Sequence, residues 1–297
     1  MFKQSMIMCL FLISSVALPA QAAAVNYIAI GDSLAAGQTP NREIGAGYAD
    51  MIAMGLQPDA YSKQLSVPGY TVEQVIGQVE SEAGQQAIQS ADLVTISAGA
   101  NDLLPLIQND PNRGMLTFNA ITAAFALNGV REDYALLLEK ISALNPSADV
   151  YAMGYYFPYP HVFDQHKPAV SKQLDVLNQI IEQEAEKAGA TFVPVAGRFG
   201  LDAAEYLPNP ADVHPNEAGY LEMANAFLAV YAPGKEIPAS ILTQLPEPVS
   251  LSELIQQRQA AEEEVDAEET ETVEETAAIK GCTKQEVYAS AGQKGDS

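Results

Sequence analysis

The stretch that decides the fold is VNYIAIGDSLAAG, residues 25–37, in which an apolar run leads into glycine, aspartate and serine. The run at 25–30 is short and apolar, as expected of a buried strand in a parallel sheet. The residues after it favour a tight turn and the start of a helix, because glycine suits turns and aspartate and serine are preferred helix caps. Ser33 therefore has two interpretations, a helix cap or a catalytic nucleophile, and these residues alone permit both.

Short β-rich runs and longer helical patterns alternate from residue 23 to about residue 235. This order is typical of an α/β protein, in which helices cover a parallel sheet. Strands are expected at 25–30, 60–67, 93–98, 149–156 and 191–196. Helices are expected at 131–145, 171–189 and 216–232, the last following Pro215, which fits a first helical turn. The pattern predicts one doubly wound sheet in a domain at residues 23–247.

The first residues predict a secretory signal peptide at 1–22. They carry a single positive charge at Lys3, an apolar run, and then Ala20-Gln21-Ala22, a small-x-small site that suits signal peptidase. The alternative is an N-terminal membrane anchor, but the run is shorter than about 18 apolar residues and ends at Pro19 and the alanine-rich site. We therefore expect a secreted, extracellular protein without a stable membrane anchor.

The C-terminal segment, residues 248–297, differs from the rest of the chain in composition. It holds nine acidic residues and no basic one between Glu262 and Glu275. Such a run predicts an acidic tail that is disordered or a frayed helix, and contact with a basic surface or with cations is the alternative role. The net charge of −23 disfavours nucleic acid or an anionic membrane as the main partner, because both would repel the chain.

Three further positions share with Ser33 an expected place near the carboxyl ends of strands. They are Gly69 in VPGYT, Asn101 in GAND and His214 in DVHPN. An asparagine amide and a backbone N–H at glycine can donate to an oxyanion, and a histidine is the base that a serine nucleophile needs. Each residue alone is explained equally well as a cap or turn residue. Together, in this order, they favour a catalytic site at one edge of the sheet.

These residues resemble the diagnostic blocks of the GDSL family of serine esterases and lipases, also called SGNH hydrolases. The blocks correspond to Gly31-Asp32-Ser33-Leu34, Gly69, Gly99-Ala100-Asn101-Asp102 and His214-Pro215. The resemblance covers roughly residues 25–232 and leaves the C-terminal tail outside. It implies a three-layer α/β/α sandwich of flavodoxin-like type with a five-stranded parallel sheet.

The resemblance also implies a role for each matched residue. Ser33 would be the nucleophile and His214 the general base and acid. The N–H of Ser33, the N–H of Gly69 and the side chain of Asn101 would be the oxyanion donors. No metal or organic cofactor is implied, since the serine supplies the nucleophile and the protein's own donors stabilise the charge.

The chain departs from the family pattern at the third member of the catalytic triad. The family usually has an aspartate three residues before the histidine, where this chain has Ala211, and Asp212 stands two residues before it. In an extended segment, residues two apart project to the same face, so the Asp212 carboxylate could reach Nδ1 of His214. In a turn it could miss, and a backbone carbonyl would then complete a Ser-His dyad.

The expected function is that of a secreted serine esterase or lipase acting on a small-molecule or lipid ester. The alternatives are a carbohydrate acetylesterase and an inactive secreted binding protein on a hydrolase scaffold. The segment after the fourth strand contains Tyr155, Tyr156, Phe157 and Tyr159, which either line an acyl pocket or simply pack. His161 and His166 in the same segment have no motif partner and are interpreted as loop residues.

Overall fold

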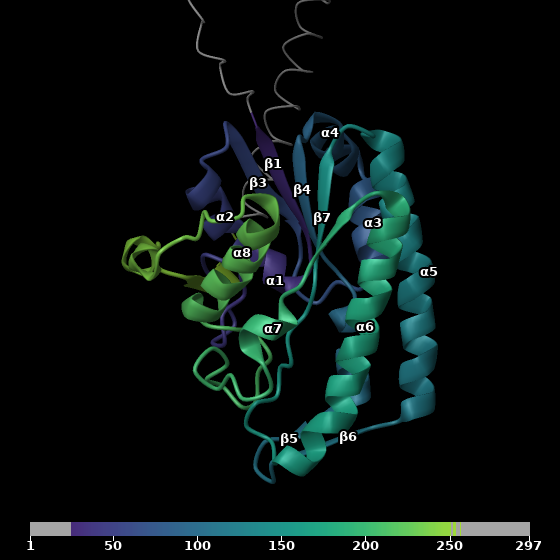
Figure 1. Ribbon diagram of the computed structural model, residues 1–297, viewed down its shortest axis with the longest axis vertical. Coiled ribbons are helices and arrows are strands. Elements are labelled where there is room, and N and C mark those ends of the chain that lie inside the picture. Colours follow the sequence, from purple (N-terminus) through teal and green to yellow (C-terminus); the bar gives the residue numbers. More distant parts are fainter. Residues whose placement is uncertain (1–24, 251, 254–255, 257–297) are drawn as a thin grey trace, which may run out of the picture.

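The computed structural model describes residues 25–250, 252–253 and 256 of the chain (Figure 1). The predicted signal peptide at 1–22 and nearly all of the predicted tail at 248–297 lie outside these residues. Of the helices within the described part, none is both long enough and apolar enough to cross a membrane.

A five-stranded parallel sheet forms the centre of the protein, as the sequence predicts. Its strands are β1 (Asn26–Gly31), β3 (Ala60–Ser66), β4 (Leu93–Ser97), β7 (Asp149–Met153) and β8 (Thr191–Val193). They are arranged in the order β3-β1-β4-β7-β8, and every neighbouring pair is parallel. Numbered along the chain, these strands have the order 2-1-3-4-5, which is the flavodoxin-like doubly wound topology.

Helices cover both faces of the sheet, which makes the three layers of an α/β/α sandwich (Figure 1). One layer contains α3 (Val72–Glu80), α4 (Glu82–Ser90), α5 (Ala120–Leu144) and α6 (Lys167–Ala188). The other contains α2 (Tyr48–Leu56), α7 (Ala196–Phe199) and α8 (Glu217–Tyr231), with the short α1 (Ser33–Ala36) near it. The predicted fold class is therefore confirmed.

The core lies between the sheet and these two helical layers. In β1, Tyr27, Ala29 and Ile30 are completely buried, and Ile30 lies opposite Leu65 of β3 and Ile96 of β4. Both faces of a central parallel strand meet helices, so successive residues are apolar rather than alternating with polar ones. This explains why the apolar run of β1 is continuous in the sequence.

Several boundaries differ from the predicted ones. Helix α5 begins at Ala120, whereas the prediction was 131–145, because Asn119 accepts hydrogen bonds from the N–H groups of Ile121 and Thr122 and so caps an earlier start. Helix α8 is capped by Asn216, so Pro215 precedes the helix rather than occupying its first turn.

Two predicted strands are shorter than expected. Strand β7 ends at Met153 instead of residue 156, and the following residues leave the sheet. Strand β8 ends at Val193 instead of residue 196, because Pro194 has no N–H to continue the ladder and α7 begins at Ala196.

A small hairpin, made of β5 (Ile107–Asp110) and β6 (Met115–Phe118), was not predicted. Its residue Leu116 packs with Phe157, Val162 and Val170 in an apolar cluster separate from the main core. The remaining elements are β2 (Glu43–Ile44), β9 (Val249–Ser250) and the 3-10 turns η1 (Ala100–Asp102), η2 (Leu104–Leu106), η3 (Asp164–His166) and η4 (Ala239–Gln244). The hairpin lies at the end of the molecule beyond the carboxyl ends of the strands (Figure 1).

Candidate active site

Ser33 lies at the tip of a sharp turn between β1 and α1. Gly31 ends the strand with a φ of 135°, and a Cβ atom there would lie 2.0 Å from the carbonyl oxygen of Ser97, so only glycine fits. Asp32 caps α1 by accepting a hydrogen bond from the N–H of Leu34 at 2.9 Å. Ser33 is the first residue of α1 and is 7% exposed. Both interpretations of the motif therefore describe parts of one turn, in which Asp32 caps the helix and Ser33 faces a pocket.

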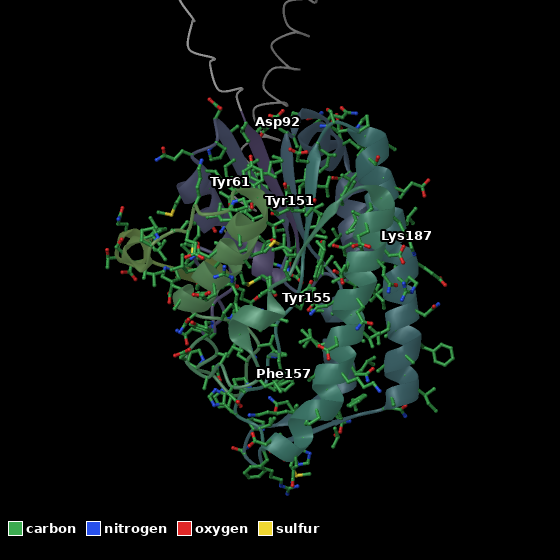
Figure 2. The ribbon with its side chains drawn as sticks, viewed as in Figure 1. Tyr61, Asp92, Tyr151, Tyr155, Phe157 and Lys187 are labelled. Atoms are coloured by element: carbon green, nitrogen blue, oxygen red, sulfur yellow. The ribbon has the colours of Figure 1, made fainter. Side chains whose placement is uncertain are left out.

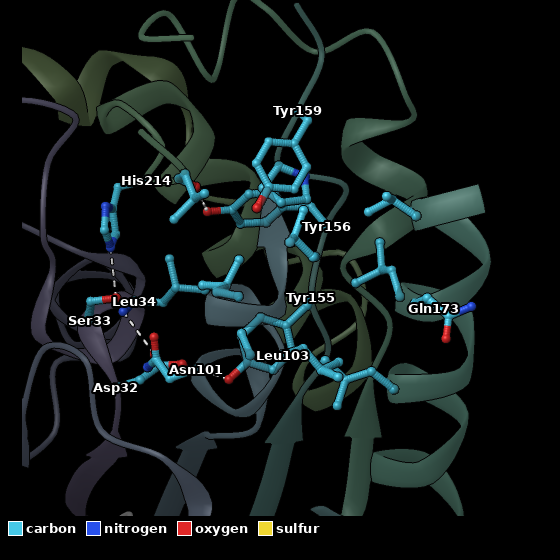
Figure 3. Close-up of a pocket in the computed structure, with 18 residues that line it drawn as sticks. Asp32, Ser33, Leu34, Asn101, Leu103, Tyr155, Tyr156, Tyr159, Gln173 and His214 are labelled. Carbon is cyan, nitrogen blue, oxygen red and sulfur yellow. Dashed lines mark hydrogen bonds between the residues drawn. The ribbon is translucent and has the colours of Figure 1, made fainter. Parts of the chain in front are cut away.

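His214 lies between Ser33 and Asp212 in a continuous hydrogen-bonded row. Its Nε2 is 2.8 Å from Oγ of Ser33, and its Nδ1 is 2.6 Å from Oδ1 of Asp212. Figure 3 shows His214 above Ser33 with the hydrogen bond between them. The distances permit Nδ1–H to donate to the carboxylate while Nε2 accepts the serine proton.

Asp212 reaches the imidazole from an irregular segment, residues 212–216, that is assigned neither to a strand nor to a turn. The same Oδ1 atom also accepts a hydrogen bond from the backbone N–H of His214, at 2.8 Å. Burial raises the pKa of Asp212, but the hydrogen bonds and charge of His214 outweigh burial and leave that pKa below its ordinary value. The carboxylate is therefore ionised at neutral pH, beside the ring nitrogen that it contacts.

Of the two predicted oxyanion donors outside the Ser33 turn, Asn101 lines the pocket and Gly69 does not. Asn101 lies in η1 and lines the same pocket as Ser33, and its amide nitrogen donates to the carbonyl oxygen of Tyr70 at 2.9 Å. An amide nitrogen carries two hydrogens, so this bond orients Asn101 and leaves one hydrogen for a ligand. Gly69 lies in the turn after β3 with a φ of 84° and open space where a Cβ atom would lie, but it does not line the pocket. The structure thus brings Ser33 and Asn101 together at the pocket and leaves Gly69 outside its lining.

Asp32 has a second set of contacts that the sequence did not indicate. Its carboxylate accepts hydrogen bonds from Oγ of Ser97 at 2.5 Å and from the hydroxyl of Tyr155 at 2.7 Å. Burial raises the pKa of Asp32 above its ordinary value, although the hydrogen bonds from Ser97, Tyr155 and the Leu34 N–H oppose that rise. These hydrogen bonds hold Asp32, the residue before Ser33, against β4 and against the segment that follows β7. Tyr155 is 123 positions away from Asp32, so no local pattern could have revealed this pair.

A pocket of about 630 Å³, its open mouth included, begins at Ser33 and His214 (Figure 3). Tyr155, Tyr156 and Tyr159 line it, whereas Phe157 packs in the separate apolar cluster. Tyr155 and Phe157 lie along the segment that leads from β7 toward the β5–β6 hairpin (Figure 2). The interpretation of the aromatic segment as a pocket wall therefore holds for three of its four members.

The two other histidines do not line this pocket. Nε2 of His161 lies 2.7 Å from the carbonyl oxygen of Leu207, and His166 contacts the neighbouring Gln165. His161 lies in the irregular segment after β7, as a loop residue does, whereas His166 is the last residue of η3, directly before α6.

A serine at a strand-to-helix turn, in line with a histidine and a carboxylate, is the constellation that serine hydrolases share across unrelated folds. Residues 29–221 match the family described as the GDSL-like Lipase/Acylhydrolase family. The chain belongs to that family of hydrolases.

Solved structures with the same fold include known esterases and lipases. The lipase Lip_vut3 from a goat rumen metagenome is 20% identical with a TM-score of 0.54, and the match covers 71% of this chain and 98% of that one. Axe2, an acetylxylan esterase from Geobacillus stearothermophilus, is 21% identical with a TM-score of 0.50, over 70% of this chain and 94% of that one. The uncharacterized protein YpmR of Bacillus subtilis is 24% identical over 200 residues, 65% of this chain and 75% of YpmR.

Proposed function

We propose that the protein is a serine esterase that cleaves carboxylic esters through an acyl-enzyme on Ser33. The observation that carries this proposal is the row of two short contacts, 2.8 Å from Ser33 Oγ to His214 Nε2 and 2.6 Å from His214 Nδ1 to Asp212 Oδ1. A serine hydroxyl is a weak nucleophile until a neighbouring base removes its proton, and His214 is within reach to do so.

The reaction divides into two steps. Ser33 Oγ bonds to the ester carbonyl carbon as its proton passes to His214 Nε2, and the resulting tetrahedral oxyanion collapses with loss of the alcohol, which takes that proton from His214. Water then attacks the acyl-enzyme by the same route, its proton passing to His214 and on to Ser33, and the carboxylic acid leaves. Asp212 stabilises the imidazolium that forms in each step.

The oxyanion needs donors near Ser33. We assign this role to the N–H of Ser33 at the start of α1, to the free amide hydrogen of Asn101 and to the N–H of Gly69. The placement of Asn101 in the pocket supports its assignment directly, whereas the assignment of Gly69 rests on the family resemblance and on the open space around it.

The test compares Ser33→Ala with wild type on 4-nitrophenyl butyrate. We expect Ser33→Ala to lower kcat by at least about 10³-fold, because no other group replaces the nucleophile. Ser142→Ala, at an exposed position of α5, is the matched control and should retain wild-type turnover. Equal activities of wild type and Ser33→Ala would refute the proposal.

An inactive binding protein on a hydrolase scaffold is the competing function. A fluorescent organophosphonate labels only a serine that is activated as a nucleophile, so mass spectrometry of the labelled chain separates the two functions. Covalent modification at Ser33 supports the esterase, and an unmodified chain supports the binding protein.

Secretion is part of the same proposal. The sequence of residues 1–22, with its apolar run and its Ala20-Gln21-Ala22 site, supports export and cleavage after Ala22. N-terminal sequencing of protein from the culture medium should then begin at Ala23, and retention of Met1 in cell extracts alone would contradict export.

A further inference from the structure

The pocket beside Ser33 has a polar end and a long apolar body. The catalytic side chains occupy the polar end, together with Asn101. One wall of the body comes from Leu103 and Leu104, in the turns before the hairpin, and from Ile107, the first residue of β5, and another wall comes from α6. We call this body the slot. Figure 3 shows Ser33 on one side of the view and Gln173 on the other, with Leu103 and Tyr155 between them.

One face of α6 forms a largely apolar wall of the slot. Val170, Gln173, Leu174 and Leu177 line it, at the helical spacing of i, i+3, i+4 and i+7 that places four residues on one face. Seven residues of helix correspond to about 10 Å. This wall is long enough to lie against several methylene groups of an aliphatic chain.

Two of the three tyrosines that line the pocket, Tyr155 and Tyr156, present ring faces rather than free hydroxyls to the slot. The hydroxyl of Tyr155 donates to Asp32 at 2.7 Å, and the hydroxyl of Tyr156 donates to the carbonyl oxygen of Val213 at 2.8 Å. A sugar needs several hydrogen-bonding partners in its site, because its hydroxyls lose those made with water. The hydroxyls of Tyr155 and Tyr156 already donate to protein atoms and are not free to bind a sugar. This wall therefore suits an aliphatic chain.

The position of His214 determines which half of an ester enters the slot. Nε2 of His214 must donate its proton to the alcohol oxygen of the ester as the alcohol leaves. The alcohol therefore lies on the His214 side of Ser33. In Figure 3 His214 lies above Ser33, while the slot extends sideways from Ser33, with Tyr155 and Leu103 below and Tyr156 and Tyr159 above. The acyl chain is therefore the half that lies in the slot.

We infer that the slot binds an unbranched aliphatic acyl chain, so that medium-chain acyl esters are preferred over acetyl esters, acetylated sugars included. This inference rests on the proposed esterase function. It supports an acyl-lipid substrate over the carbohydrate acetylesterase alternative. Each methylene group buried in the slot is expected to raise kcat/KM by about fourfold.

The first experiment measures kcat/KM for 4-nitrophenyl acetate, butyrate, hexanoate and octanoate at monomeric substrate concentrations. We expect octanoate to exceed acetate by at least about 30-fold, since burial in the slot is incomplete at its mouth. The isomers ethyl octanoate and octyl acetate then identify the half that enters, and ethyl octanoate should be at least about tenfold better. A preference for acetate, for octyl acetate or for an acetylated xylo-oligosaccharide would overturn the inference.

A second experiment locates the preference. Leu174→Trp and Leu104→Trp fill the slot from two different elements, and each should lower the octanoate-to-acetate ratio of kcat/KM by at least about tenfold. Leu136→Trp makes the same change at an exposed position of α5 away from the slot and should leave the ratio unchanged. If both slot variants keep the wild-type ratio, the chain binds elsewhere.

The two proposals fail in different ways. A wild-type protein that is labelled at Ser33 by an organophosphonate but prefers acetyl esters refutes only the slot. A wild-type protein that is neither labelled nor active on any of these esters refutes the esterase function itself.

Discussion

Nδ1 of His214 has two polar neighbours, and only one can be its partner in the active state. Asp212 Oδ1 lies 2.6 Å from it and the amide nitrogen of Gln38 lies 3.3 Å from it. An amide N–H₂ group only donates, so it cannot bond to an Nδ1 that already carries hydrogen. When Nε2 accepts the proton of Ser33, Nδ1 must carry hydrogen, and the carboxylate is then the acceptor that fits.

Substitution at these two neighbours tests that assignment. Asp212→Ala should lower kcat by about 10²- to 10⁴-fold, because the imidazole loses both its orienting acceptor and the charge that stabilises its protonated form. Gln38→Ala, the matched control at the same nitrogen, should change kcat by less than about threefold. Steady-state kinetics on 4-nitrophenyl butyrate gives both values. A larger loss in Gln38→Ala than in Asp212→Ala would assign the orienting role to Gln38.

Asp102, next to the oxyanion candidate Asn101, provides a prediction on stability. Burial raises the pKa of Asp102 from 3.8 to about 6, although the N–H of Val72, at the start of α3, donates to the carboxylate and lowers it. Between about pH 4 and pH 6 the folded state therefore holds a proton that the unfolded state has lost. Stability falls as pH rises through that window, and the full penalty persists above it.

Asp102→Asn removes this penalty and keeps an oxygen that can accept from Val72. We expect the variant to be more stable than wild type by about 1 kcal/mol at pH 8, a value that allows for the partial exposure of the side chain. The difference should shrink toward zero at pH 4. Urea unfolding at both pH values measures it, and a difference independent of pH would show that the carboxylate's charge is not its cause.

At the scale of elements, the turn from β1 into α1 depends on how closely two strand ends approach. Gly31→Ala would place its Cβ 2.0 Å from the Ser97 carbonyl oxygen and hold alanine at a φ of 135°. We expect a loss of at least about 3 kcal/mol in unfolding free energy, since the strands must separate. Gly129→Ala, in the interior of α5 with open space around it, should instead stabilise by about 0.5–1 kcal/mol. Thermal melts of both variants measure these changes in stability. Equal melting temperatures for the two variants would contradict the close approach of Gly31 to the Ser97 carbonyl.

The same elements show how far the sequence alone predicts this fold. The strands of the sheet were predicted because a buried parallel strand is a continuous apolar run, as in β1. The first turns of α5 were missed because Ile121 and Phe125 are exposed, so the apolar residues do not follow one inward face. The β5–β6 hairpin was missed because each strand has only four residues and is partly exposed.

The site was predictable to the extent that its residues follow strand ends. Ser33 and Asn101 each come after a central strand, so parallel topology alone brings them to one edge. The contact of Asp212 with His214 depends on a local hydrogen bond between the Asp212 side chain and the His214 backbone, and the contact of Asp32 with Tyr155 joins distant parts of the chain. Neither leaves a periodic signal, so only the structure could provide them.

At the scale of the whole molecule, the part of the chain that the structure describes holds two apolar clusters of very different size, and the slot lies where they meet. The larger cluster contains the sheet and most helices, while the smaller is centred on Leu116, Phe157, Tyr159, Val162 and Val170. Val170 and Tyr159 of the smaller cluster line the slot together with Leu103 and Leu177 of the larger one. A ligand chain in the slot would therefore contact both clusters at once.

This division predicts unequal local stability. A two-stranded hairpin on a small cluster gains little from burial, so β5 and β6 should open without unfolding of the sheet. In hydrogen–deuterium exchange, amides of β5 and β6 should exchange at least about 100-fold faster than those of β1 and β4. Modification of Ser33 by an octylphosphonate should then slow exchange in the hairpin, because the octyl chain joins the two clusters, whereas a methylphosphonate should not. Equal protection of hairpin and sheet in the free protein would show that the two clusters open as one unit.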